Sequence, residues 1–144
     1  MPPRYFGPKT LNQLQLNEVK EVVELLNEIL DNSYSIFVQF RTWGNNRERQ
    51  SDLLVLTRDA IYNLEVKTFR NVLRAPYPGE WVVSNNRTVR NPIVQSEETA
   101  DNIQAKLQSE SSKIFPNSPH KQNIFRQYVK VFPLVLLKNR IQCN

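Results

Sequence analysis

The sequence predicts an α/β fold in which a central mixed sheet of four to five strands is flanked by helices. The first observation is the order of the segments, which runs helix, three strands, short hairpin, helix and strand. The second is that the central strand segments are apolar on both faces, as expected for strands that are covered on two sides. The 144 residues suit a single domain, with an extension at residues 1–10 and a tail at residues 138–144.

The first helix is expected at about residues 11–30, where apolar residues recur at helical spacing and form one stripe. Thr10 and Gln13 have the spacing of a capping box at its start. Asn17 is an alternative, later N-cap. The helix is therefore expected to cover one face of the sheet with its apolar stripe.

The second helix is expected from Asn91 to about residue 111. Asn91 followed by Pro92 is typical of an N-cap with proline at the first helical position. The side chains expected to be buried along this helix are those of Ile93, Ala100, Ile103 and Leu107.

Runs of β-branched and aromatic residues between polar turns predict the strands. Residues 51–56 and 60–69 are two such runs separated by three polar residues, which predicts a hairpin. In the last run, Pro133 indicates an edge strand or a bulge. Further strands are expected at 32–40 and 128–137, a short hairpin at 80–83 and 87–90, a polar turn at 43–49 and a loop at 115–123.

The composition excludes several classes of protein. The net charge of +5 and the pI of about 9.5 favour a polyanionic partner, nucleic acid first. Cys143 is the single cysteine, so the chain has neither an intrachain disulfide nor a cysteine zinc site. The first residues lack the apolar stretch of a signal peptide, and no apolar run is long enough to span a membrane. We therefore expect a cytoplasmic protein without a membrane partner.

Counting along the predicted hairpin sets two acidic residues opposite each other. If Arg58 and Asp59 form the tip, Asp52 faces Glu65 across the strand pair. Directly opposite side chains have Cβ atoms about 4.5–5.5 Å apart. Lys67 is two residues beyond Glu65 and therefore lies on the same face.

This arrangement points to chemistry, because two carboxylates in a partly buried site either share a proton or bind a cation. Magnesium suits such a site, since it prefers oxygen ligands and keeps several waters. A water molecule could be activated there, with Lys67 orienting it or offsetting negative charge. The alternative is structural: Glu65 and Lys67 form a solvated pair on a strand, and Asp52 is a turn residue.

Glu18 is the second acid of interest. On a helical wheel it falls between Leu25 and Ile29, inside the apolar arc of the first helix. A lone acid on a buried face needs a partner such as a metal or another cation. The alternative is that Glu18 lies in the first turn, with Asn17 as cap, and merely interacts favourably with the helix dipole.

Asp52 followed by Glu65-Val66-Lys67 resembles the D…(D/E)xK motif of the PD-(D/E)xK nuclease superfamily. Within it, "SDLLVLTRDAIYNLEVKTF" followed by "EWVV" and "NPIVQSEETADNIQAKL" is similar to the NERD, or nuclease-related, domain. The resemblance runs from about Asn17 to Leu137. Ser51 stands where the superfamily name has proline, and no glycine follows the lysine within "KTFRNVLRAP", where NERD sequences often have one.

The resemblance implies a restriction-endonuclease-like core of the order αβββαβ, a divalent Mg²⁺ or Mn²⁺, and hydrolysis of DNA phosphodiester bonds. It also implies a role for each matching residue. Metal ligands would be Asp52, Glu65 and the Val66 carbonyl; Lys67 would position the water; Glu18, with Glu21 as second choice, would be the acid of the first helix; and Gln95 would line the site or touch the substrate backbone.

Several arginines flank these positions and could rim the site and hold phosphates of single- or double-stranded DNA. For any one of them, the alternative is that it simply solvates a loop. A rival to the enzyme is a catalytically weak or inactive module that binds nucleic acid or protein, as part of a longer multidomain protein. The arginines near the site are Arg41, Arg47, Arg49, Arg70, Arg74, Arg87 and Arg90, of which Arg47, Arg49, Arg70, Arg74 and Arg87 are the expected nucleic-acid contacts.

Overall fold

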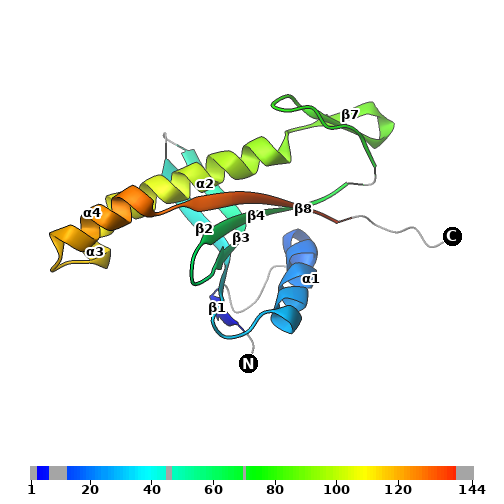
Figure 1. Ribbon diagram of the computed structural model, residues 1–144. Coiled ribbons are helices and arrows are strands. Elements are labelled where there is room, and N and C mark those ends of the chain that lie inside the picture. The colour runs from blue at the N-terminus through cyan, green and yellow to red at the C-terminus, as the bar shows by residue number, and fades with distance from the viewer. Residues whose placement is uncertain (1–2, 7–12, 45–46, 70, 139–144) are drawn as a thin grey trace.

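The computed structural model describes residues 3–6, 13–44, 47–69 and 71–138 (Figure 1). The helices are α1 (Gln13–Ile29), α2 (Pro92–Ser109), α3 (Ser111–Ile114) and α4 (Pro119–Tyr128), and a 3₁₀ turn, η1, covers Ser84–Asn86. The strands are β1 (Arg4–Phe6), β2 (Ser35–Gly44), β3 (Arg47–Leu56), β4 (Ile61–Thr68), β5 (Val72–Arg74), β6 (Trp81–Val83), β7 (Arg87–Val89) and β8 (Val131–Lys138).

The main sheet has five strands in the order β1-β2-β3-β4-β8. β1 is parallel to β2 and β4 is parallel to β8, whereas β3 is antiparallel to both β2 and β4. The sheet is therefore mixed, as predicted. The strand that carries Pro133 is an edge strand, where the missing N–H of proline is tolerated. β1 lies within the stretch that we expected to be an N-terminal extension.

The β3–β4 hairpin has the predicted register. Leu56 pairs with Ile61, and Leu54 pairs with Asn63. The N–H of Thr57 donates to the carbonyl of Ala60 at 2.9 Å, which closes the two-residue turn. Because successive strand residues point to opposite faces, this register decides which residues of β3 and β4 share a face.

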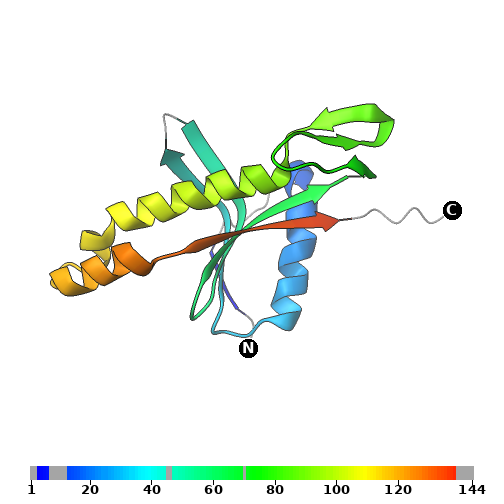
Figure 2. The same cartoon turned by 45° about the horizontal axis from the view of Figure 1, so that its top comes forward.

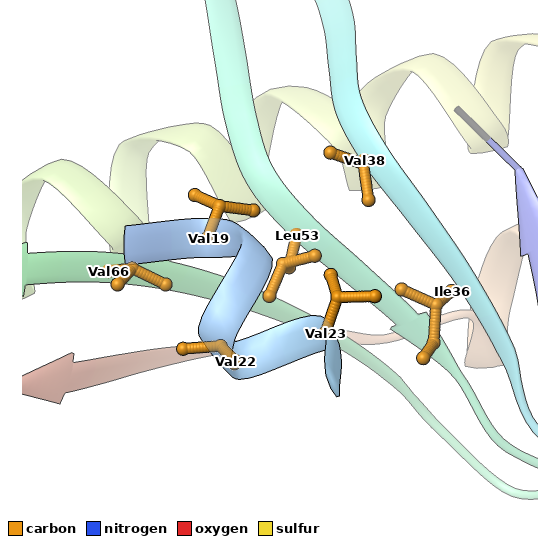
Figure 3. Packing of buried hydrophobic residues seen from close by; sticks show 7 residues of the cluster. All are labelled: Val19, Val22, Val23, Ile36, Val38, Leu53 and Val66. Carbon is orange, nitrogen blue, oxygen red and sulfur yellow. The ribbon is translucent and has the colours of Figure 1, made fainter. Parts of the chain in front are cut away.

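Each face of the sheet is covered by one helix. On one face, α1 contributes valines to an apolar cluster with residues of β2, β3 and β4 (Figure 3). On the other face, α2 packs Ala100 and Ile103 against Leu54 and Val131. The members of the α1 cluster are Val19, Val22, Val23, Ile36, Val38, Leu53 and Val66. Since Val66 points towards α1, its neighbours along β4 point towards α2.

Asn91 is the N-cap of α2, as the sequence predicted. Asn91 Oδ1 accepts hydrogen bonds from the N–H groups of Ile93 and Val94, at 2.9 and 3.3 Å. Ala100 and Ile103 are buried as predicted, and Leu107 is partly buried. Ile93 was expected to be buried, but this residue is 38% exposed. The buried residues at this end of the helix are Pro92, Ser96 and Thr99, which follow one another at a spacing of about one turn.

Other boundaries were wrong. α1 is already helical at Gln13, so Asn17 lies inside the helix and is not its N-cap; Thr10 lies outside the described residues. The turn expected at 43–49 is narrower, because β2 continues to Gly44 and β3 begins at Arg47. The loop expected at 115–123 contains the start of α4, where the Ser118 hydroxyl accepts from the N–H of Lys121 at 3.2 Å.

A small sheet of order β5-β6-β7 stands beside the start of α2 (Figures 1 and 2). The predicted hairpin is β6–β7, and β5 adds a strand that the sequence did not indicate. Asn91 Nδ2 donates to the carbonyls of Pro76 and Gly79, both at 2.9 Å, and Trp81 Nε1 donates to Pro76 at 3.1 Å. The residue that caps α2 therefore also fixes the loop before β6. Within the described ranges, no helix has the length and apolarity needed to cross a membrane.

Candidate active site

Two contacts fix the direction of α2 over the sheet. In the second half of the helix, Gln104 Oε1 accepts from the N–H of Val131, which pairs with Ile61 at the start of β4. Nearer its beginning, Ser96 Oγ accepts from Asn63 Nδ2 at 3.0 Å. Thus α2 runs antiparallel to β4, and its first turn lies towards the end of β4 that carries Glu65 and Lys67. Figure 2 shows the same end of the sheet beside the small sheet.

Asp52 and Glu65 are neighbours where the regular β3–β4 pairing stops. The last regular pair is Leu53 with Leu64, one position before the two acids. Beyond it, Asp52 Oδ2 accepts a hydrogen bond from the N–H of Val66 at 2.9 Å. A carboxylate thus takes the place of a backbone acceptor in the ladder. This holds Asp52 against β4 and leaves its charge close to Glu65.

Glu65 is an acid of this site whose pKa is strongly shifted. Its side chain belongs to a residue that is only 5% exposed. Burial, and then the negative charge of Asp52, raise the pKa of Glu65 from its ordinary value of 4.5 to about 7, while Lys67 and Arg90 act to lower it. Lys67 Nζ lies 3.7 Å from Glu65 Oε1. Glu65 Oε2 is buried and has no hydrogen-bond partner among the described residues.

An unpartnered buried carboxylate oxygen is costly, so this position favours either a proton or a cation. The donor set fits a hard divalent cation, because Asp52 and Glu65 supply carboxylates beside each other. Val66 can add a carbonyl, since the N–H and C=O of one strand residue point to the same neighbouring strand, here that of Asp52. Magnesium commonly takes one or two carboxylates and completes its shell with water and substrate phosphate.

The third acid of the sequence prediction is not placed by the structure. Glu18 lies in α1, one residue before Val19, and Figure 3 shows Val19 close to Val66 of β4. Its side chain lies outside the described residues. Among the residues that are described, no group of three or more His, Cys, Asp or Glu side chains could hold a metal. Glu21, the second choice, forms an ion pair with Lys138 at the end of β8.

Gln95 lies in the first turn of α2, towards the Glu65 end of the sheet, and is half-buried. Its backbone N–H donates to the carbonyl of Asn91 at 3.0 Å, and its carbonyl accepts from the Thr99 hydroxyl at 3.0 Å. The structure thus brings the residue to the expected end of the molecule. A contact of its side chain with substrate stays a prediction.

The arginines divide into three groups. Arg74 and Arg87 are exposed on the small sheet. Arg70 and the side chains of Arg47 and Arg49 lie outside the described residues. Arg90, which the sequence placed near the site but not among the expected nucleic-acid contacts, acts electrostatically on Glu65 and pairs with Glu98. No signal in the sequence distinguishes Arg90 from its neighbours, because its effect depends on how α2 packs on the sheet.

A buried polar network beside the acids was also missed. Asn63 and Ser96 are fully buried, and so is Ser51, which directly precedes Asp52. Asn63 Nδ2 donates to the carbonyl of Ser96 at 3.2 Å, so its Oδ1 must be the atom that accepts from the Ser51 hydroxyl. The network joins β3, β4 and α2 next to Asp52 and two residues before Glu65. An asparagine inside the apolar run "IYNLEV" was the signal that could have revealed it.

A mixed sheet between two helices, with adjoining acids and a lysine at the end of a central hairpin, defines a restriction-endonuclease-like core. Comparison of the sequence with models of known protein families supports this class of fold. The profile of the NERD family, described as the nuclease-related domain, matches residues 15–137. The chain therefore belongs to the NERD family, and its function is nuclease-related. No curated protein and no solved structure matches the chain.

Proposed function

We propose that this domain is a Mg²⁺- or Mn²⁺-dependent nuclease that hydrolyses DNA phosphodiester bonds. The observation that carries the proposal is the buried, unpartnered Oε2 of Glu65 beside the carboxylate of Asp52. Two such acids, set together on an apolar hairpin, raise the free energy of the metal-free fold at neutral pH. A bound cation would offset this cost, and the same cation could take part in catalysis.

In this proposal Asp52, Glu65 and the Val66 carbonyl hold the cation, which stabilises negative charge on the phosphate and makes water a better nucleophile. Asp52 is kept in place by the Val66 N–H. Because its pKa is about 7, the Glu65 carboxyl is partly protonated at neutral pH when no cation is present, and binding of the cation would release this proton. Glu18 and Gln95 complete the proposed set, from α1 and from the first turn of α2.

Lys67 is the residue we assign to the reacting water and phosphate. Its Nζ lies next to Glu65 Oε1 at 3.7 Å, and its side chain is 31% exposed, so it reaches both the acid and solvent. An ammonium group there can orient the attacking water and offset the charge that develops on the phosphate oxygens. In the hydrolysis, the water oxygen bonds to phosphorus and the bond to the leaving sugar oxygen breaks.

DNA is the proposed substrate because phosphodiesters are the polyanions that match a net charge of +5 and exposed arginines near the acids. Arg74 and Arg87 are exposed on the small sheet beside this end of β4, which suits contacts to the DNA backbone. The same role is proposed for Arg47, Arg49 and Arg70 from their places in the sequence.

A second candidate function is a catalytically weak or inactive module that binds nucleic acid or protein, within a longer multidomain protein. The observation in its favour is that the described residues contain no cluster of three potential metal-ligating side chains. Two acids alone can hold a cation without supporting fast hydrolysis. Activity rather than binding separates the two functions.

The test is a cleavage assay with plasmid and single-stranded DNA in Mg²⁺, Mn²⁺ or chelator. Wild type should cleave only with metal, and Asp52→Ala and Lys67→Ala should each lose at least about 100-fold in rate, as expected for groups that stabilise developing charge. Asp59→Ala and Lys121→Ala are matched controls, because both residues are exposed and lie away from β4's acidic end. Equal cleavage by wild type and the Asp52 and Lys67 variants, or none by any of them, would overturn the catalytic function.

A further inference from the structure

Arg90 joins β7 to α2 at the end of the molecule that holds the two acids. It directly precedes Asn91, whose side chain both caps α2 and binds the loop before β6. Because α2 begins towards the Glu65 end of β4, Arg90 lies at the same end of the sheet as the two acids. The positive charge of Arg90, like that of Lys67, acts to lower the pKa of Glu65. Its side chain is nevertheless 48% exposed, so the guanidinium is open to solvent.

Glu98 binds one nitrogen of the Arg90 guanidinium. Arg90 Nη2 donates to Glu98 Oε2, which projects from α2 two turns after the cap. A guanidinium has five N–H donors in a planar fork. In the described part of the chain, no other hydrogen bond of Arg90 occupies the remaining donors. The group is therefore oriented by one partner and keeps donors for another.

We propose that Arg90 binds a phosphate of the substrate next to the acid pair, and that Glu98 positions its guanidinium for this contact. The proposal rests on the proposed function for the nature of the substrate and adds a phosphate ligand that the motif does not contain. Lys67 would meet the reacting phosphate as a point charge. Arg90 would meet a phosphate as a planar fork that can donate two parallel hydrogen bonds.

The competing explanation is that Arg90 and Glu98 merely stabilise the fold. Exposed ion pairs contribute about 0–1 kcal/mol, and both of these side chains are at least 40% exposed. The pair is thus a weak structural contact, and variants at either position should fold. Their thermal unfolding should match that of wild type, which allows binding to be measured without a folding defect.

The first experiment measures binding of a fluorescein-labelled DNA duplex and single strand by anisotropy, with chelator present so that no cleavage occurs. Arg90→Gln should weaken binding by about 5–10-fold and should lower the slope of log affinity against log salt by about one. Arg90→Lys keeps the positive charge but loses the planar guanidinium, so its affinity for DNA should lie between those of wild type and Arg90→Gln. Arg58→Gln is the control, because Arg58 is exposed at the β3–β4 turn, at the opposite end of β4.

The second experiment tests Glu98 by a double-mutant cycle. Glu98→Gln should weaken binding by about 2–5-fold in a chain that has Arg90 and should have no effect in the Arg90→Gln background. A removed acid that acted only through net charge would instead improve binding equally in both backgrounds. That outcome would contradict the positioning role of Glu98.

Two further outcomes test the Arg90 contact and separate it from the nuclease function. If Arg90→Gln and Arg58→Gln weaken binding equally, or if wild type binds neither DNA, Arg90 is not a phosphate ligand of this site. Cleavage is scored separately with metal present. A chain that loses DNA affinity specifically at Arg90 but never cleaves DNA would support the Arg90 contact and refute the nuclease function.

Discussion

Glu65 has a carboxylate that its surroundings only partly satisfy. One oxygen lies 3.7 Å from the Lys67 ammonium, and the other is buried without a hydrogen-bond partner in the described residues. Burial and the charge of Asp52 both disfavour ionisation of Glu65, and its pKa is raised to about 7. In the metal-free protein, Glu65 is therefore partly protonated near pH 7, and this residue should contribute to the change of stability with pH.

Stability of the metal-free protein is expected to fall as pH rises from about 4.5 to about 7. In this window the folded chain keeps the Glu65 proton that the unfolded chain has lost, because the folded pKa is raised from 4.5 to about 7. The shift corresponds to at most about 3 kcal/mol. Urea unfolding at several pH values in chelator measures it, and Glu65→Gln should remove this part of the fall. Parallel pH profiles of wild type and variant would show that Glu65 is not perturbed.

The β3–β4 hairpin is the element that creates the site, and its register was predictable from sequence. The turn lies at Arg58 and Asp59, so alternation alone sets Asp52 near Glu65. What counting could not give is the Asp52 bond to the Val66 N–H, which appears where the regular pairing ends. The buried network of Asn63 was also out of reach, because its partners come from β3 and α2, far away in the chain.

Asn63 should stabilise the pairing of β3, β4 and α2 around the acids. Asn63→Leu replaces it with a side chain of similar size that cannot bond to Ser51 or Ser96. The expected loss of unfolding free energy is about 1–3 kcal/mol, because buried polar partners are left with fewer hydrogen bonds. Urea unfolding measures the loss. Asn123→Leu, at an exposed position of α4, should change stability by less than about 0.5 kcal/mol; equal effects would argue against the network.

Helices were predicted well where cap and apolar stripe agree and poorly where only composition was available. α2 has both signals, an Asn91 cap and an inward face at Ala100 and Ile103. α4 has a Ser118 cap and Pro119 at its first position, but it buries no residue fully, so no apolar stripe marked it. Pro119 was read as a loop residue, although proline is favoured in the first turn of a helix.

At the scale of the whole molecule, the architecture brings segments from distant parts of the sequence to one end of the main sheet. The end of β4, the first turn of α2 and the small sheet meet there (Figures 1 and 2). A mixed sheet between helices was predicted from the αβββαβ order of segments, but the strand order was not predicted, and β1 was taken for part of an extension. The position of the small sheet did not follow, because it is fixed by Asn91 and by Trp81 bonding to the same loop carbonyl.

The central claim is that Asp52 and Glu65 share one divalent cation. Titration calorimetry with Mn²⁺ near pH 7, in buffers of different ionisation enthalpy, measures both binding and proton release. We expect one ion per chain, release of part of a proton because the Glu65 pKa is about 7, and at least about tenfold weaker binding for Asp52→Asn and Glu65→Gln. Absence of Mn²⁺ binding by wild type, or unchanged affinity in both variants, would contradict the claim.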